Sequence, residues 1–82
     1  MEFRFTPHAV EEMQERGIPL QIVLTVLDHP EQITAEQNNR HAYQAEVVIN
    51  NKAYILRAIV EIDGTVVTVY RTSKIKKYWS EE

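Results

Sequence analysis

The chain has 82 residues, a net charge of −3, 44% apolar and 26% charged residues, and no cysteine. These values are typical of one small globular domain with one core, and they exclude disulfide bonds and thiolate metal ligands. The acidic balance also argues against indiscriminate nucleic-acid binding. No apolar run approaches the roughly 20 residues that span a bilayer, and the first residues lack the apolar segment of a signal peptide. We therefore expect a soluble, cytoplasmic protein with a single domain over residues 1–82.

A short strand and a helix are predicted first. Residues 2–5 alternate polar and apolar side chains, as a strand does. Thr6 then stands at an N-cap position and Pro7 at the first helical position, while Gly17 suits the residue just after the helix. These three signals explain where the helix starts and stops. They leave two interpretations of His8, as a surface residue of the first turn or as a proton-transfer group.

A second helix is predicted to begin after Ile18-Pro19 and to end before Pro30, because the residue before a proline avoids helical geometry. Residues 30–39 are polar and rich in turn formers, so they predict a loop in which only Ile33 is tucked beneath the fold. The apolar stripe of this helix consists of Ile22, Val23, Val26 and Leu27.

From Arg40 onward the hydrophobic period becomes two, which predicts three antiparallel strands. A turn within residues 50–52 separates the first two strands, and Asp63-Gly64 predicts a two-residue hairpin turn before the third. The tail from Ser73 predicts a turn of helix or an edge segment that docks its aromatic side chains. The face turned toward the helices is predicted to hold Tyr43, Ala45, Val47, Ile49, Tyr54, Leu56, Ala58, Val60, Ile62, Thr65, Val67 and Val69.

The predicted order is therefore β-α-α-β-β-β, an α+β fold in which two N-terminal helices pack on one face of an antiparallel sheet. With these turns Arg57 lies opposite Tyr70, and a turn at Asn51-Lys52 places Glu46 opposite Arg57. This second face is either an ordinary solvated face or a concave, cationic and aromatic surface for a polyanion. It is predicted to gather Gln44, Glu46, Arg57, Thr68, Tyr70 and Thr72.

Basic residues concentrate near the C-terminus. Residues 1–41 carry a net charge of −4 and residues 42–82 a net charge of +1. The segment RTSKIKK, residues 71–77, has four positive charges and no negative one, so it forms either a solvated face or an anion-binding patch. Arg71 points toward the helix side but lies at a strand end, where it can bend round. A cluster that can grip phosphate and stack a base is predicted from Tyr70, Arg71, Thr72 and Lys74.

Three segments resemble a small bacterial family known as domain of unknown function 4258. HAVEEMQERGI resembles its opening H-A-x3-M-x2-R-G-I, and DHPEQI and VVTVYRTSKIKKYW resemble its later segments, so the resemblance covers almost the whole chain. That family is thought to be related to the RelE/ParE toxin superfamily, whose members share a helix–helix–sheet fold. Some relatives cleave messenger RNA on the ribosome, and others bind gyrase. The resemblance thus implies a RelE-like fold, a toxin-like function, and RNA, the ribosome or an antitoxin protein as partners.

The resemblance also suggests a metal-independent endoribonuclease, which needs a proton acceptor, a proton donor and cations that stabilise the phosphorane. No cofactor is expected, and His29 and His41 lack a metal-ligand spacing. Each candidate also has a structural interpretation, such as packing of the Arg16 stem. The expected catalytic residues are His8, Arg57, Tyr70 and Lys74. The expected phosphate-binding residues are Arg16, Arg40, Arg71 and Thr72.

An alternative function needs no catalysis. The chain would then be a protein-binding module, or a degenerate toxin, that uses its polar sheet face or an edge strand to hold an antitoxin segment or its own copy. The expected state in solution is a monomer or a small homo-oligomer.

Overall fold

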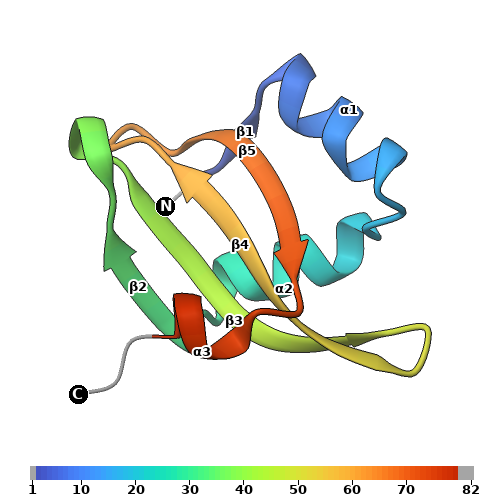
Figure 1. Cartoon of the computed structure of the whole chain (residues 1–82). Coiled ribbons are helices and arrows are strands. Elements are labelled where there is room, and N and C mark those ends of the chain that lie inside the picture. Colours follow the sequence, from blue (N-terminus) through green and yellow to red (C-terminus); the bar gives the residue numbers. More distant parts are fainter. Residues whose placement is uncertain (1, 80–82) are drawn as a thin grey trace.

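The computed structural model describes residues 2–79 and has the predicted α+β fold, with one strand more than the sequence indicated (Figure 1). A short 3-10 helix, η1, precedes the three long strands. The elements in chain order are β1 (Arg4–Phe5), α1 (Pro7–Glu15), α2 (Leu20–Asp28), β2 (Gln32–Ala35), η1 (Gln37–Asn39), β3 (His41–Ile49), β4 (Lys52–Val60), β5 (Thr65–Thr72) and α3 (Ile75–Tyr78).

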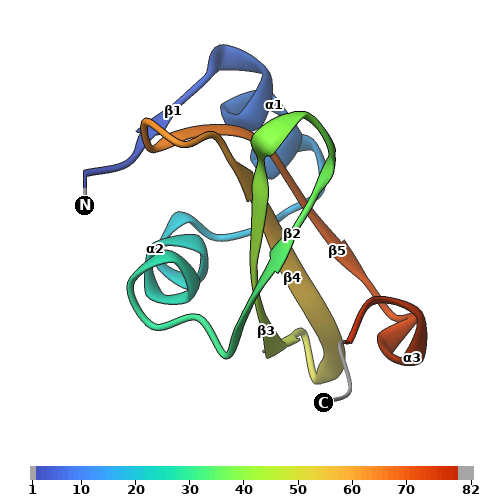
Figure 2. The same ribbon diagram turned by 90° about the vertical axis from the view of Figure 1, so that its left-hand side faces the viewer.

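The five strands form one sheet in the order β1-β5-β4-β3-β2, so β4 is its central strand. All neighbours are antiparallel except β1 and β5, which run parallel where Arg4 aligns with Thr65. In both views α1 lies at the upper end, along β5, and α2 lies beside β3 and β4 (Figures 1 and 2). Within residues 2–79, no helix is long and apolar enough to cross a bilayer.

The predicted cap signals explain the first helix. The Thr6 Oγ1 accepts a hydrogen bond from the Ala9 N–H at 3.0 Å, which satisfies one of the free donors of the first turn. At the other end Gly17 has a φ of +61°, a conformation that favours glycine, and the Ile18 N–H returns to the Met13 carbonyl at 2.9 Å. Ala9 and Met13 are buried against the sheet, because residues four apart lie on the same face of a helix.

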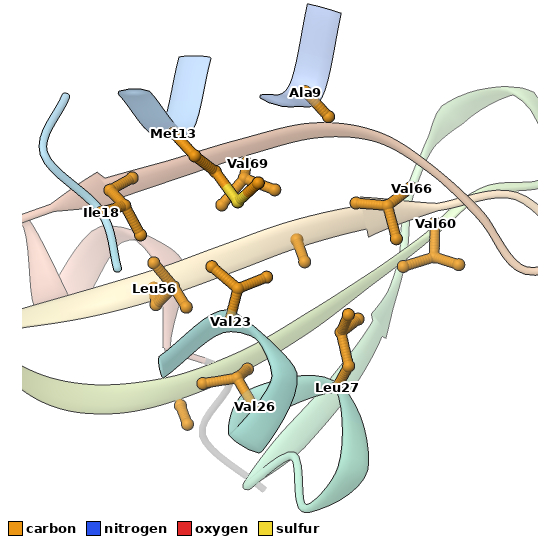
Figure 3. Packing of buried hydrophobic residues seen from close by; sticks show 12 residues of the cluster. Ala9, Met13, Ile18, Val23, Val26, Leu27, Leu56, Val60, Val66 and Val69 are labelled. Carbon is orange, nitrogen blue, oxygen red and sulfur yellow. The ribbon is translucent and has the colours of Figure 1, made fainter. Parts of the chain in front are cut away.

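One continuous apolar core fills the space between the two longer helices and the sheet (Figure 3). From β4 it takes Leu56, Ala58 and Val60, which are at most 1% exposed. The period-two pattern therefore identified the inward face of the central strand correctly. The other buried members of the core are Ala9, Met13, Ile18, Val23, Val26, Leu27, Ala45, Val66 and Val69.

The turn between β4 and β5 differs from the predicted two-residue turn. The Gly64 N–H bonds the Glu61 carbonyl and the Glu61 N–H bonds the Thr65 carbonyl, both at 2.9 Å, so three residues form the loop. Gly64 has a φ of +94° and takes the position that needs glycine. Ile62 is consequently a loop residue that is 71% exposed, and its predicted inward position is wrong. Hydrogen bonds from Thr65 to Asp63 lower the pKa of that carboxyl.

A β-bulge then compensates for the longer loop. Val60 pairs with Val66 instead of Val67, so the register shifts by one residue between Ile59 and Val60. From Ile59 back to Ile55, farther from the turn, the pairing is the predicted one, with Thr68 opposite Ile59. Val66, and not Val67, therefore fills the core next to Val60, where it is fully buried.

The turn between β3 and β4 is Asn50-Asn51 and not Asn51-Lys52. Both asparagines have positive φ, 52° and 65°, as a two-residue turn of the type common in hairpins requires. As a result Gln44 lies opposite Arg57, and the predicted Glu46–Arg57 pair is wrong.

The segment over residues 30–39, predicted to be a loop, contains β2 and η1. β2 pairs with β3 along four residues and forms one edge of the sheet. Ile33 is 52% exposed, so its predicted position beneath the fold is also wrong. Four residues with only one large apolar side chain are too short for a period-two signal to be recognised.

Candidate functional site

Arg57 lies at the centre of the sheet face opposite α1 and α2, and its neighbours on both sides are side chains of adjacent strands. Its Nε donates to the Gln44 Oε1 of β3 at 2.7 Å, and its Nη1 donates to the Tyr70 hydroxyl of β5. Its Nη2 donates to the Glu36 Oε2 at 3.1 Å in an ion pair. Each nitrogen of the guanidinium thus has a partner, which fixes the plane of the group.

The C-terminal helix covers this cluster. The Tyr78 ring of α3 lies 4.7 Å from the Arg57 guanidinium carbon, and the Gln44 Nε2 donates to the Tyr78 carbonyl at 3.0 Å. Gln44 is fully buried and Arg57 is 4% exposed. The second face is therefore not open at its centre, contrary to the prediction of a solvated or concave surface, although Arg57 does pair with Tyr70 as predicted.

A second cluster joins α1 to β5. The Glu12 carboxylate accepts hydrogen bonds from the Thr68 hydroxyl and, at 3.2 Å, from the Val69 N–H. The same carboxylate lies 3.5 Å from His8 Nε2 and 3.3 Å from Arg16 Nη1. One side of the helix thus carries, at intervals of four residues, His8, Glu12 and Arg16. This side faces the edge of β5.

Strand β5 brings the two clusters next to each other. Thr68 and Tyr70 are two residues apart on the same face, opposite Ile59 and Arg57, and such residues are about 7 Å apart along a strand. The His8 side chain is 70% exposed and belongs to the cluster around Glu12. The arrangement therefore combines an exposed imidazole with a phenol whose oxygen is held in place by a guanidinium.

The other predicted residues lie around this centre or away from it. Thr72 ends β5, where its hydroxyl accepts the N–H of Lys74 at 3.0 Å, and Lys74 is exposed. Arg71 stays on the opposite face, with its guanidinium carbon 4.8 Å from the Tyr54 ring. Arg40 lines a surface pocket of about 580 Å³ together with Glu36, the ion-pair partner of Arg57.

Sequence reasoning missed two members of the centre. Glu36 lies just before η1, in the segment predicted to be a loop, and no local pattern indicated that it would reach Arg57. Tyr78 was expected to dock an aromatic ring, but its position over Arg57 depends on how the chain turns after β5. Among residues 2–79, no three histidine, aspartate or glutamate side chains converge in a way that could hold a metal ion.

The fold and the two clusters define a small α+β domain with a buried arginine at the centre of its sheet. Comparison with protein families gives a match to the domain of unknown function DUF4258 over residues 5–71. The chain therefore belongs to this family. Searches of curated proteins and of solved structures give no match.

Proposed function

We propose that this chain is a cytoplasmic, RelE/ParE-like toxin-superfamily domain over residues 1–82 that acts as a metal-independent endoribonuclease. The observation that carries the proposal is the juxtaposition on β5 of the Arg57–Tyr70 pair and the Thr68–Glu12–His8 contacts. It supplies two groups of the kind that general acid–base catalysis uses, both in clusters that meet on β5: an imidazole that is 70% exposed and a half-buried phenol.

In the proposed reaction the ribose 2′-oxygen attacks the adjacent phosphorus, the bond to the 5′-oxygen breaks, and a 2′,3′-cyclic phosphate forms. His8 takes the proton of the 2′-hydroxyl, because an imidazole accepts protons near neutral pH. The Tyr70 hydroxyl gives its proton to the departing 5′-oxygen. Lys74 and Arg16 are exposed cations that offset the charge that develops on the phosphorane oxygens.

Arg57 has a supporting role in this proposal. Its three nitrogens already bond to Gln44, Tyr70 and Glu36, so it orients the Tyr70 hydroxyl and does not contact phosphate. The flanking phosphates of the RNA are assigned to exposed or half-buried groups outside the cluster, namely Arg40, Arg71 and Thr72.

The test is cleavage of free RNA in the presence of EDTA, with a ribosome-bound messenger RNA in Mg²⁺ buffer as a second substrate, because ribosomes need Mg²⁺ to stay assembled. We expect the wild-type protein to cleave, and we expect Tyr70→Phe and His8→Ala each to reduce the rate by about 10²-fold or more, the usual contribution of an acid–base group. Glu11→Ala, at an exposed position of the same helix, is the matched control and should leave the rate unchanged. Equal rates for all four proteins, or no cleavage at high protein concentration, would rule out the proposal.

A second candidate function, protein binding through an edge strand, is favoured by the geometry of β2. The Glu36 N–H bonds the Arg40 carbonyl of the β3 side at 2.9 Å, so by alternation the backbone groups of Ile33 and Ala35 point away from β3. Ile33 is also 52% exposed. An antitoxin segment or a second copy can add a strand at this edge.

Ile33→Pro tests this second function, because proline removes the backbone donor that an added strand needs. If β2 is the binding edge, the substitution should abolish the dimer, or the complex with a co-expressed neighbouring gene product, in gel filtration. The matched control is Ile33→Thr, which changes the same side chain but keeps the backbone donor. An oligomer that survives Ile33→Pro would exclude the β2 edge.

A further inference from the structure

Two cations gather around one tyrosine at the end of the sheet that lies away from α1. The Arg71 guanidinium carbon is 4.8 Å from the centre of the Tyr54 ring, and the Lys52 Nζ is 5.5 Å from the same centre. Lys52 and Tyr54 lie two residues apart on one face of β4, and Arg71 lies diagonally across on β5, opposite Leu56. This is the helix side of the sheet, so the group is separate from the Arg57–Tyr70 cluster.

Within residues 2–79, neither cation has an acidic partner. In the part of the chain that the structure describes, the ion pairs involve Arg4, His8, Arg16 and Arg57 as the basic members, and Lys52 and Arg71 are absent from them. Two like charges held near one ring repel each other, and the ring offsets only part of this cost. An anionic ligand bound at this end would relieve the repulsion and gain charge-assisted contacts with both cations.

More positive charge lies close by in the chain. Lys74, Lys76 and Lys77 are exposed residues in and just before α3, which follows directly from the end of β5. In Figures 1 and 2 the β3–β4 hairpin, the end of β5 and α3 all lie at the lower end of the molecule. In the described part of this acidic chain, five cations that form no ion pair and the aromatic rings of Tyr54 and Tyr78 thus lie at one end.

We propose that Lys52, Tyr54 and Arg71 form a phosphate clamp for single-stranded RNA, with the α3 lysines continuing the path of the strand. The ammonium and the guanidinium each pair with a phosphate of the bound strand. The Arg71 guanidinium carbon lies 4.8 Å from the centre of the Tyr54 ring, and a base of the strand stacks on this cation–ring pair. A duplex keeps its bases stacked internally, and it therefore cannot use this platform.

The choice of RNA as the ligand rests on the proposed function, but the test does not require cleavage. The probe is a fluorescein-labelled 12-nucleotide 2′-O-methyl RNA, which has no free 2′-hydroxyl and cannot be cut by the proposed reaction. Binding is followed by fluorescence anisotropy at two or more salt concentrations, with the matching duplex as a second probe. The protein is the full chain.

We expect Lys52→Ala and Arg71→Ala each to weaken binding of the single strand by about tenfold, the value of one exposed charge-assisted contact. Each should also reduce the slope of log affinity against log salt by about 0.7. The matched control is Arg4→Ala, which removes the same charge from a cation paired with Asp63 at 3.1 Å, and it should change affinity by less than about twofold. Tyr54→Leu keeps an apolar side chain and should weaken binding through loss of the ring.

The clamp would be wrong if Arg4→Ala weakened binding as much as Arg71→Ala, because net charge alone would then explain the affinity. It would also be wrong if the duplex bound as tightly as the single strand, or if the wild-type protein did not bind. Thermal unfolding of each variant identifies any loss that comes from misfolding, and Arg71→Gln, which keeps a long polar side chain but removes the charge, then replaces Arg71→Ala. Failure of cleavage in EDTA with intact binding would reject the nuclease and retain the clamp.

Discussion

Replacement of Arg57 by methionine is expected to lower the free energy of unfolding by about 2–4 kcal/mol, because it leaves buried polar partners without a donor. The Gln44 Oε1 is fully buried and loses its 2.7 Å hydrogen bond, and the Glu36 carboxylate, on a side chain that is 33% exposed, loses its cation. Methionine fills a similar volume, so the loss reports on polar contacts more than on a cavity. Urea unfolding followed by circular dichroism measures the change.

The Arg4–Asp63 pair provides the control for this substitution. Its side chains are 64% and 63% exposed and its N–O distance is 3.1 Å, the same as that of the Arg57–Glu36 pair. Because exposed ion pairs contribute little, Arg4→Met should cost less than about 1 kcal/mol. Equal costs for the two substitutions would mean that the Arg57 cluster is solvated, and the description of a covered centre would have to be abandoned.

The second large effect concerns two adjacent residues that point to opposite faces of β4. Ile55 and Leu56 are both fully buried, Leu56 in the core beneath the helices and Ile55 on the face that carries Arg57. We expect Ile55→Ala and Leu56→Ala each to lower the free energy of unfolding by about 2–5 kcal/mol, the range for large-to-small changes in a core. The same unfolding experiment provides both values.

Val48→Ala is the matched control, because Val48 is on the same face as Ile55 but is 67% exposed. It should change stability by no more than about 0.5 kcal/mol. If Ile55→Ala behaved like Val48→Ala, the second face would be open to solvent at its centre, as the sequence had indicated.

Local patterns predicted the helices, the inward face of β4 and most of the pairing between β4 and β5. The pairing of Arg57 with Tyr70 was predicted from a two-residue turn that does not exist. The real loop has one residue more, and the bulge next to Val60 absorbs it, so the two errors cancel. Turn length and bulge position both depend on how the whole hairpin packs, and a sequence pattern of period two records neither.

The contacts that complete the site could not be predicted, because they join segments far apart in the chain. Glu36 reaches Arg57 across 21 residues, and Glu12 reaches Thr68 across 56 residues. Only the packing of α1 along β5 brings the Glu12 carboxylate, with His8 beside it, to Thr68. The position of the Tyr78 ring over Arg57 likewise depends on how the chain turns before α3. The sequence therefore predicts which residue types lie on each face of the sheet. The burial of these side chains and the distances between them depend on the tertiary structure.

Cleavage of RNA without a metal ion can be measured on a DNA oligonucleotide that contains a single ribonucleotide, incubated with the full chain in EDTA. We expect one cut, on the 3′ side of the ribonucleotide, with a 2′,3′-cyclic phosphate on one product, a 5′-hydroxyl on the other, and loss of the cut in Tyr70→Phe. Products with a 5′-phosphate, or a cut that appears only when Mg²⁺ is added, would contradict it.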